Sequence, residues 1–374
     1  MFGLRKEVLQ FLRIFQFTGF LPFKLAESDS HVGGVAFAVN VIILVTLLGP
    51  IFYDDLSAYL SILSAWDIGM LLSSHLLTLR HRKIYEKFFK AVGKIDRMIV
   101  DDLKMGQKLQ ELNVKTHRVF VILWTFFIGC ALYYPIMSQL TNGFSYIPMY
   151  RALIWTLLIN LNIIKFLYFY AIIAVRLDVI RKCLSDMSCD KANNNIKFVK
   201  ELFADNAKIS RLSKIIALRQ IYHCVWLLQS LCYEFAGVFF IFYFASYWGQ
   251  TILIISIIIK PAILNGTLEE NIFMIILFIC ILNLFTVITF FLSYTIFNRG
   301  SIIAGLIHDI AKSDDQLTKE AIKMFSLQTI QQPMTTINIL GLYNYDRLSI
   351  NAVSKLVTMK PCAVRVRLDF SLAF

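Results

Sequence analysis

The chain has 374 residues, of which 57% are apolar and only 17% are charged, and its mean hydropathy is +0.64. A soluble globular protein is nearer half apolar with about one charged residue in four, so this composition excludes that class. The formal net charge of +12 does not indicate nucleic-acid binding by itself, because its location along the chain decides what it faces. The composition predicts an all-α, polytopic membrane protein with no nucleic-acid partner.

The N-terminal segment, residues 1–31, precedes the first apolar span and contains an amphipathic stretch. Val8, Phe11, Leu12 and Phe15 share one helical face. This face fits either a helix lying in the membrane interface or a helix packed against the rest of the bundle. Both alternatives are open at this point.

The membrane spans come next along the chain. The hydrocarbon core of a bilayer is about 30 Å thick, so a helix needs about 20 apolar residues to cross it. Six clear stretches meet this requirement: Val32–Tyr53, Tyr59–Leu79, Val119–Ser138, Leu153–Val175, Val225–Tyr247 and Ile272–Thr295. They define a transmembrane bundle over 32–295, a cytoplasmic helical region over 296–350 and an atypical basic tail over 351–374.

The distribution of Lys and Arg predicts the orientation, because these residues concentrate on the cytoplasmic side of membranes. Of the 37 Lys and Arg residues, 34 lie in four segments on one side: 1–31, 80–118, 176–224 and 296–374. Arg151 and Lys260 lie on the opposite side, and Lys165 lies inside a span. The N-terminus is therefore predicted to be cytoplasmic, with the positive charge facing the cytosol and the anionic lipid of the bilayer.

The long inner segments are patterned as helices rather than as loops. Phe88, Ile95 and Ile99 recur near helical spacing in 80–118, and Ile303 and Ile307 do so after the sixth span. Such apolar stripes need a partner surface. We expect the helices to continue into the cytosol and to pack together there.

Polar residues inside the spans are candidate functional positions, because ionisable groups there usually face the bundle interior and find partners. Lys165 and Glu234 lie at similar predicted depth in the fourth and fifth spans, which predicts a buried ion pair. Asp67, Asn160 and Asn162 are polar candidates for a ligand pocket.

Aromatic residues near the outer ends of the spans have two interpretations of about equal weight. Tyr133, Tyr134 and Tyr243 belong either to the interfacial aromatic belt or to a pocket for a small amphipathic ligand. The sequon Asn265-Gly266-Thr267 lies on the predicted outer side, which makes Asn265 a candidate glycosylation site.

A conspicuous motif follows the sixth span. The run Phe325-Ser326-Leu327-Gln328 leads to Gln332-Pro333, so a helix is predicted to end or kink at the proline. Gly341-Leu342-Tyr343 then indicates a turn, followed by Asp346-Arg347.

This motif resembles the region before the last span of insect gustatory receptors, a family within the insect chemoreceptor superfamily. The resemblance in residues covers about 325–347, and the resemblance in layout covers 1 to about 350. It implies seven spans and homo- or hetero-tetramers with other gustatory receptor subunits, which form a ligand-gated cation channel with one central pore. It implies a ligand pocket in the outer half of each subunit, and a cytoplasmic anchor between subunits that includes the helix of Phe325 to Gln332.

The same resemblance implies a plasma-membrane protein of sensory neurons that detects small-molecule tastants. The choice of bitter or aversive compounds among them rests on the resemblance alone. The tail departs from the family, whose last span lines the pore and ends near Thr-Tyr, five apolar residues and Gln-Phe. Four cations and a proline stand here instead: Lys355, Lys360, Pro361, Arg365 and Arg367. Each cation near a helix centre costs about 2.5–3.5 kcal/mol, so the tail is not predicted to span.

The expected seventh span is thus disrupted, and the chain alone is predicted not to conduct. Two explanations are open: intron sequence read as coding sequence after about Asn351, or a genuine isoform. No catalytic, metal or cofactor motif occurs, so no enzyme activity and no cofactor are predicted. The alternatives are a secondary transporter, favoured by Lys165, Glu234 and Asp67, and a seven-span G-protein-coupled receptor, which needs an outer N-terminus.

Overall fold

The computed structural model describes residues 6–18, 20–21, 34–39, 41–42, 69, 71–142, 146–189, 204–253, 268–310, 316–336, 338–339 and 343–344. Side chains are described in these ranges except in 130–142, 146–159, 204–210, 244–253 and 268–283 and at a few single positions. The labelled helices are α1 (Lys6–Phe17), α4 (Arg82–Asp101), α5 (Gly106–Asn142), α6 (Tyr146–Cys189), α7 (Ala204–Leu253), α9 (Leu268–Ile310) and α10 (Gln316–Gln331). Residues 71–80 are also helical and lead through His81 into α4.

The helices are much longer than a bilayer is thick. α6 has 44 residues, α7 has 50 and α9 has 43. At about 1.5 Å per residue, each is roughly 65–75 Å long, about twice the hydrocarbon thickness. The third to sixth predicted spans lie inside α5, α6, α7 and α9, which continue beyond them. The all-α polytopic membrane fold is confirmed, with the helices extending past the predicted bilayer.

Two stretches with described side chains are long and apolar enough to cross a bilayer, Arg211–Gly237 in α7 and Thr286–Ile310 in α9. On α9, the large apolar side chains of Val287, Phe291 and Phe297 are exposed and recur near helical spacing. An exposed apolar stripe of this kind fits contact with lipid or with a neighbouring chain.

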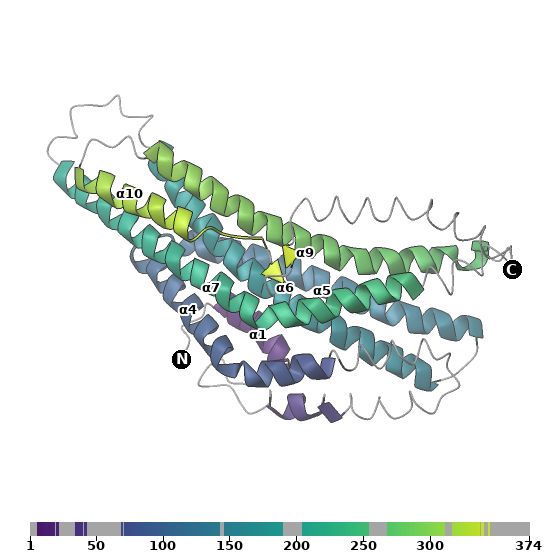
Figure 1. The fold of residues 1–374 in the computed structure, drawn as a ribbon. Helices are drawn as coiled ribbons and strands as arrows, with labels where there is room; N and C mark the ends of the chain where they lie inside the picture. Colours follow the sequence, from purple (N-terminus) through teal and green to yellow (C-terminus); the bar gives the residue numbers. More distant parts are fainter. Residues whose placement is uncertain are drawn as a thin grey trace.

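Helix α6 lies at the centre of the bundle (Figure 1), where it packs against α5, α7 and α9. Every side chain from Asn160 to Leu177 is buried. A helix that is apolar on all sides is stable only when neighbours surround it, and this sequence is apolar over nearly its whole circumference. The polar residues on α6 are therefore held inside the protein.

Aromatic rings join α4, α6 and α7. The Tyr85 ring on α4 stacks on Phe235 of α7 at a centroid distance of 4.3 Å. Phe166 on α6 stacks on Phe239 of α7 at 4.6 Å, and Phe169 contacts Phe235 edge to face at 5.5 Å. Such pairs contribute about 0.5–1.5 kcal/mol each beyond the area they bury. The high aromatic content of the sequence is used here to fix the mutual positions of three helices.

The amphipathic N-terminal helix α1 packs on the bundle. Its apolar face is buried against α5 and α6, with the Phe11 ring 4.3 Å from Tyr168 and 5.9 Å from Phe120. Of the two alternatives for residues 1–31, packing against the bundle is the one that the structure forms. The stripe of Val8, Phe11, Leu12 and Phe15 is covered by the bundle, so it is not available to the membrane interface.

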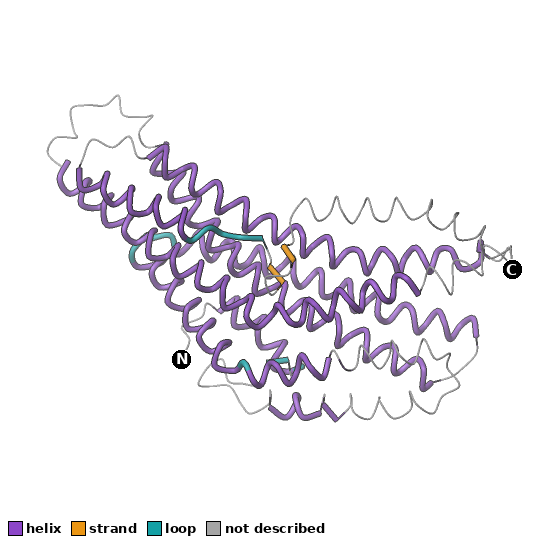
Figure 2. The backbone as a smooth tube through the Cα atoms, viewed as in Figure 1, coloured by secondary structure: helices purple, strands orange, loops and turns teal. Residues whose placement is uncertain are grey.

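Helix α10 lies beside α7 and α9 at one end of the bundle (Figure 1). It ends at Gln331, two residues before Pro333, as the proline predicted. Residues Gln332–Thr336, the post-α10 segment, then run as a loop towards the strands β1 (Asn338–Ile339) and β2 (Tyr343–Asn344), which pair antiparallel (Figure 2). The turn predicted at Gly341 falls between these strands, at residues that the structure does not describe.

The charge distribution gives a direct test of orientation. An epitope tag at residue 1 is expected to be inaccessible to antibody on intact cells and accessible after permeabilisation, because 34 of the 37 Lys and Arg residues share the side of the N-terminus. A tag inserted after Gly143, in the connection between α5 and α6, is expected to be accessible on intact cells. Labelling of the residue-1 tag without permeabilisation would reverse the topology and favour the G-protein-coupled alternative.

Candidate functional site

A lysine lies fully buried in the middle of the helical bundle. Lys165 on α6 is 0% exposed, and its Nζ atom lies 4.4 Å from the centroid of the Phe166 ring and 5.5 Å from that of Phe20. A desolvated cation–π contact contributes about 2 kcal/mol. Removing a cation from water costs several kcal/mol. The aromatic rings therefore offset only part of the cost of burying the charge.

Polar side chains of residues 71–80 face the same part of α6. The Asn162 amide donates from Nδ2 to Ser74 Oγ at 2.7 Å, and Asn162 and Lys165 are neighbours on one face of α6. His75 follows Ser74, and its ring lies 4.8 Å from the Phe20 ring that also contacts Lys165. We refer to Ser74, His75, Asn162 and Lys165 as the buried polar cluster.

The hydrogen-bonding capacity of the buried polar cluster is incompletely used. His75 Nδ1 lies 2.8 Å from the Leu71 carbonyl oxygen; because a carbonyl only accepts, Nδ1 carries the proton and donates it. Among the described residues, no hydrogen-bond partner reaches His75 Nε2, Asn162 Oδ1 or Lys165 Nζ. Buried polar atoms are almost always paired in folded proteins, so three such atoms in one place need an explanation.

The ion pair predicted between Lys165 and Glu234 is wrong. Their depths are similar, as expected, because the neighbouring rings of Phe166 and Phe235 are 6.2 Å apart. Glu234, however, is exposed on α7, whereas Lys165 is fully buried without a carboxylate partner in the described residues. Counting residues along a helix predicts depth, but the rotation of each helix against its neighbours decides which side chains meet.

The other predicted pocket residues are only partly brought together. Asn160 and Asn162 are both buried on α6, and Asn162 belongs to the buried polar cluster. Tyr243 is buried on α7 and stacks on Phe239 at 6.2 Å, which is packing within one helix. Asp67 and Asn265 lie outside the described residues, and the structure does not describe the side chains of Tyr133 and Tyr134 on α5.

The motif residues of α10 mostly hold this helix on α7. Phe325 is buried, with its ring 5.8 Å from Tyr222. Gln328 donates from Nε2 to the Arg219 carbonyl at 3.3 Å and to Gln332 Oε1 at 3.1 Å. Five other motif positions contribute less or are not described: Ser326 is half-buried, Leu327 and Pro333 are exposed, and Gly341 and Asp346 lie outside the described residues.

The Gln332 side chain ties the end of α10 to α7 a second time. Its Oε1 atom accepts from His223 Nδ1 at 3.0 Å, and its carbonyl accepts from the Tyr222 hydroxyl at 3.1 Å. Further along the post-α10 segment, Gln229 Nε2 donates to the Thr335 carbonyl at 2.6 Å, and the Tyr233 hydroxyl donates to the Thr336 carbonyl at 2.8 Å. One polar face of α7 therefore holds the whole segment.

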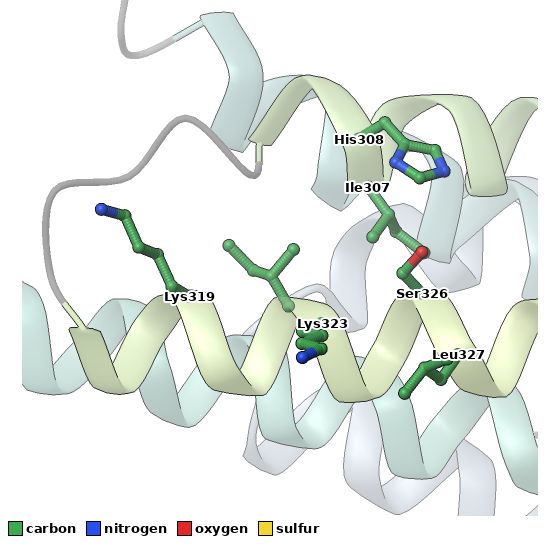
Figure 3. A pocket seen from close by; sticks show the side chains of 7 residues that line it. Ile307, His308, Lys319, Lys323, Ser326 and Leu327 are labelled. Carbon is green, nitrogen blue, oxygen red and sulfur yellow. The ribbon is translucent and has the colours of Figure 1, made fainter.

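An open cavity of about 270 Å³ lies between α9 and α10. Helix α9 contributes Ile307 and His308, and α10 contributes the remaining side chains, among them two lysines (Figure 3). The lining residues are Ile307, His308, Lys319, Ile322, Lys323, Ser326 and Leu327. His308 and both lysines are exposed, so the lysine charges are solvated and need no bound anion. The buried polar cluster is the stronger candidate for ligand recognition.

A comparison with protein families shows the family of this chain. A family model described as 7tm chemosensory receptor matches residues 11–355. The chain belongs to the 7tm chemosensory receptor family. The match spans most of the chain and confirms the resemblance to insect chemoreceptors at the level of the family. A search of curated proteins finds no match.

Some residues of this chemosensory receptor were not singled out in the sequence. Ser74 and His75 were not selected, although a serine and a histidine within an apolar span are a recognisable signal. The bidentate pair of Arg176 on α6 and Asp96 on α4, at 2.8 Å, was missed as well. No local pattern could have found that pair, because 80 residues separate its members.

Proposed function

We propose that this chemosensory receptor is a gustatory receptor subunit that recognises a small-molecule tastant at the buried polar cluster and gates a cation channel in the plasma membrane of sensory neurons. The family match supports the receptor role. The observation that favours this location for the ligand is the set of buried polar atoms on His75, Asn162 and Lys165 that have no hydrogen-bond partner among the described residues. Ligand sites are typically apolar with a few convergent polar groups.

The cluster is well placed to influence the rest of the bundle. A ligand shifts a conformational equilibrium only if it contacts the two states differently. A ligand at the cluster would contact α6 and residues 71–80. Helix α6 is joined to α9 by Arg299, which donates to the Ala174 carbonyl at 2.7 Å and pairs with Asp178 at 2.6 Å. Helix α9 in turn packs on α10. A small displacement of α6 would thus reach the segment that precedes the family's pore-lining span.

Assembly with further subunits is part of the proposal. Several large apolar side chains project from α10 without cover in the single chain, including Ile330 at 69% exposure and Leu317 at 63%. Met324 and Leu327 are exposed on the same helix. An apolar helix face in the cytosol needs a protein partner rather than lipid. We propose that α10 joins an anchor between the subunits of a homo- or hetero-tetramer.

The transporter alternative has no observation in its favour. Transporter sites are typically formed by broken helices in two corresponding halves of the chain. In the ranges described, α6, α7 and α9 are each continuous over more than 40 residues. Of the three residues that motivated that alternative, Lys165 and Glu234 do not meet, and Asp67 lies outside the described residues.

The charged residues of the C-terminal tail lead to a prediction about ion conduction. Residues 352–374 carry Lys355, Lys360, Arg365 and Arg367, and burying several unpaired cations in a bilayer is unfavourable. The chain expressed alone is expected to give no tastant-gated current. A chimera in which an apolar span ending in the family's Thr-Tyr and Gln-Phe pattern replaces the tail is expected to conduct in response to tastants.

Patch-clamp recording of both proteins with a tastant panel, alongside surface biotinylation, checks this prediction. A chimera that reaches the surface yet responds to no compound would contradict the proposed function. Robust tastant-gated current from the unmodified chain alone would show that the pore lies elsewhere.

A further inference from the structure

We propose that the buried polar cluster selects small organic carboxylates, with Lys165 as the counter-ion. This inference rests on the proposed function, because it names the chemical class of the ligand at the same site. It starts from the charge of the cluster. Among the described residues, no carboxylate lies within hydrogen-bonding distance of Lys165 Nζ.

The described acidic groups on the neighbouring helices are engaged or directed elsewhere. Asp96 pairs with Arg176, Asp178 pairs with Arg299, and Glu234 is exposed on α7. Among the described residues, the Lys165 amine therefore has no anion to stabilise its protonated form. A carboxylate ligand would neutralise that charge, and N⁺–H···O⁻ hydrogen bonds are about twice as strong as neutral ones. A neutral ligand would offer no negative charge to stabilise the protonated amine.

The remaining groups refine the shape of the ligand. Asn162 Oδ1 has no partner and can only accept, so it favours a ligand that also carries a hydroxyl or amide N–H next to the carboxylate. The rings of Phe20, Phe37 and Phe166 surround the His75 and Lys165 side chains at centroid or Nζ distances of 4.4–5.5 Å. These rings favour an apolar, preferably aromatic, body. A 2-hydroxy aromatic acid combines all three features.

The test measures binding to the purified full chain in nanodiscs, so that it does not depend on conduction. The probes are benzoate, phenylacetate and mandelate, each compared with its methyl ester and primary amide. Titration calorimetry and ligand-induced thermal shifts give the affinities. We expect each acid to bind at least tenfold more tightly than its ester and amide, and mandelate to bind more tightly than phenylacetate.

Three variants locate the selectivity. Lys165→Met is expected to abolish the preference for acids while folding normally, because an apolar side chain of similar length replaces an uncompensated buried charge. Lys165→Arg, which keeps the charge, is expected to keep the preference. Lys115→Met removes an exposed lysine of α5 and is expected to leave binding unchanged.

Each other outcome contradicts the inference. Equal affinity for acids and their neutral isosteres would show that charge does not select the ligand, while small-molecule recognition itself would stand. An acid preference that survives in Lys165→Met would place the anion site elsewhere. If none of the probes binds, the carboxylate inference is overturned, and the tastant-gated current of the chimera decides separately whether the proposed function falls with it.

Discussion

Replacing Asp96 with alanine is expected to destabilise the receptor by on the order of 3–5 kcal/mol, because it strands the Arg176 charge inside the protein. The Arg176 guanidinium is 0% exposed and donates to both carboxylate oxygens of Asp96 at 2.8 Å. A third N–H group donates to the Ile172 carbonyl at 3.0 Å. The pair joins α4 to the central helix α6, so its loss is expected to loosen the bundle where the two helices meet.

The measurement is thermal unfolding of the detergent-purified chain, followed by fluorescence-detected size exclusion, together with the surface yield. Glu86→Ala is the matched control, because Glu86 pairs with Arg82 on the exposed surface of the same helix. Exposed pairs contribute about 0–1 kcal/mol, so this variant is expected to melt close to the wild type. Equal melting of Asp96→Ala and Glu86→Ala would refute the structural role of the buried pair.

The double variant Asp96→Leu with Arg176→Met separates the charge from the packing. Apolar residues of similar size often replace a buried ion pair with little loss, or with a gain, of stability. The double variant is therefore expected to recover most of the stability that Asp96→Ala loses. Failure of that recovery would show that the geometry of the hydrogen bonds, rather than the uncompensated charge, controls stability at this point.

The second large effect is expected at Gly300 of α9, which lies against Met334 of the post-α10 segment. A Cβ atom added at Gly300 would lie 2.5 Å from Met334 Cβ and 2.8 Å from Met334 Cγ, and Met334 is itself buried. Overpacking of this kind typically costs about 1–3 kcal/mol. Gly300→Ala is expected to lower the melting temperature and to push the post-α10 segment away from α9, which would disturb its hydrogen bonds to α7 and reduce tastant-gated current in the chimera.

Gly305→Ala provides the control on the same helix. A Cβ at Gly305 meets nothing within 4 Å, so this change should show only the ordinary gain of about 0.5–1 kcal/mol for Gly to Ala inside a helix. The loss caused by Gly300→Ala is expected to be smaller in a Met334→Gly background, because glycine lacks both the Cβ and the Cγ atom that the added methyl group would meet. If both glycine variants stabilise the chain equally, the close approach of Met334 to α9 has no energetic weight.

Local sequence patterns were sufficient for several features of this receptor. The apolar face of Val8, Phe11 and Phe15 predicted a helix with one buried side, and Pro333 predicted the end of α10. Both features depend only on periodicity or on the geometry of a single residue. The long apolar runs likewise predicted the all-α membrane fold, because a bilayer leaves a chain few ways to satisfy its backbone.

The candidate site was only partly predictable. Asn162 and Lys165 were recognised as polar positions inside a span, but their surroundings were assigned incorrectly. The residues that complete the site, Ser74 and His75, come from a segment almost ninety residues earlier, as the 88-residue separation of Asn162 and Ser74 shows. Such pairings depend on how two helices are placed beside each other, which neither helix encodes alone.

The sequence by itself therefore determined the class of the protein, the periodicity of its helices and the family motif before the last segment. The tertiary structure decided which side chains meet: Lys165 with the rings of Phe20 and Phe166 rather than with Glu234, and Arg176 with Asp96. The physical reason is rotational. Helical periodicity places a side chain around its own helix axis, whereas the rotation and offset of neighbouring helices result from packing over the whole bundle.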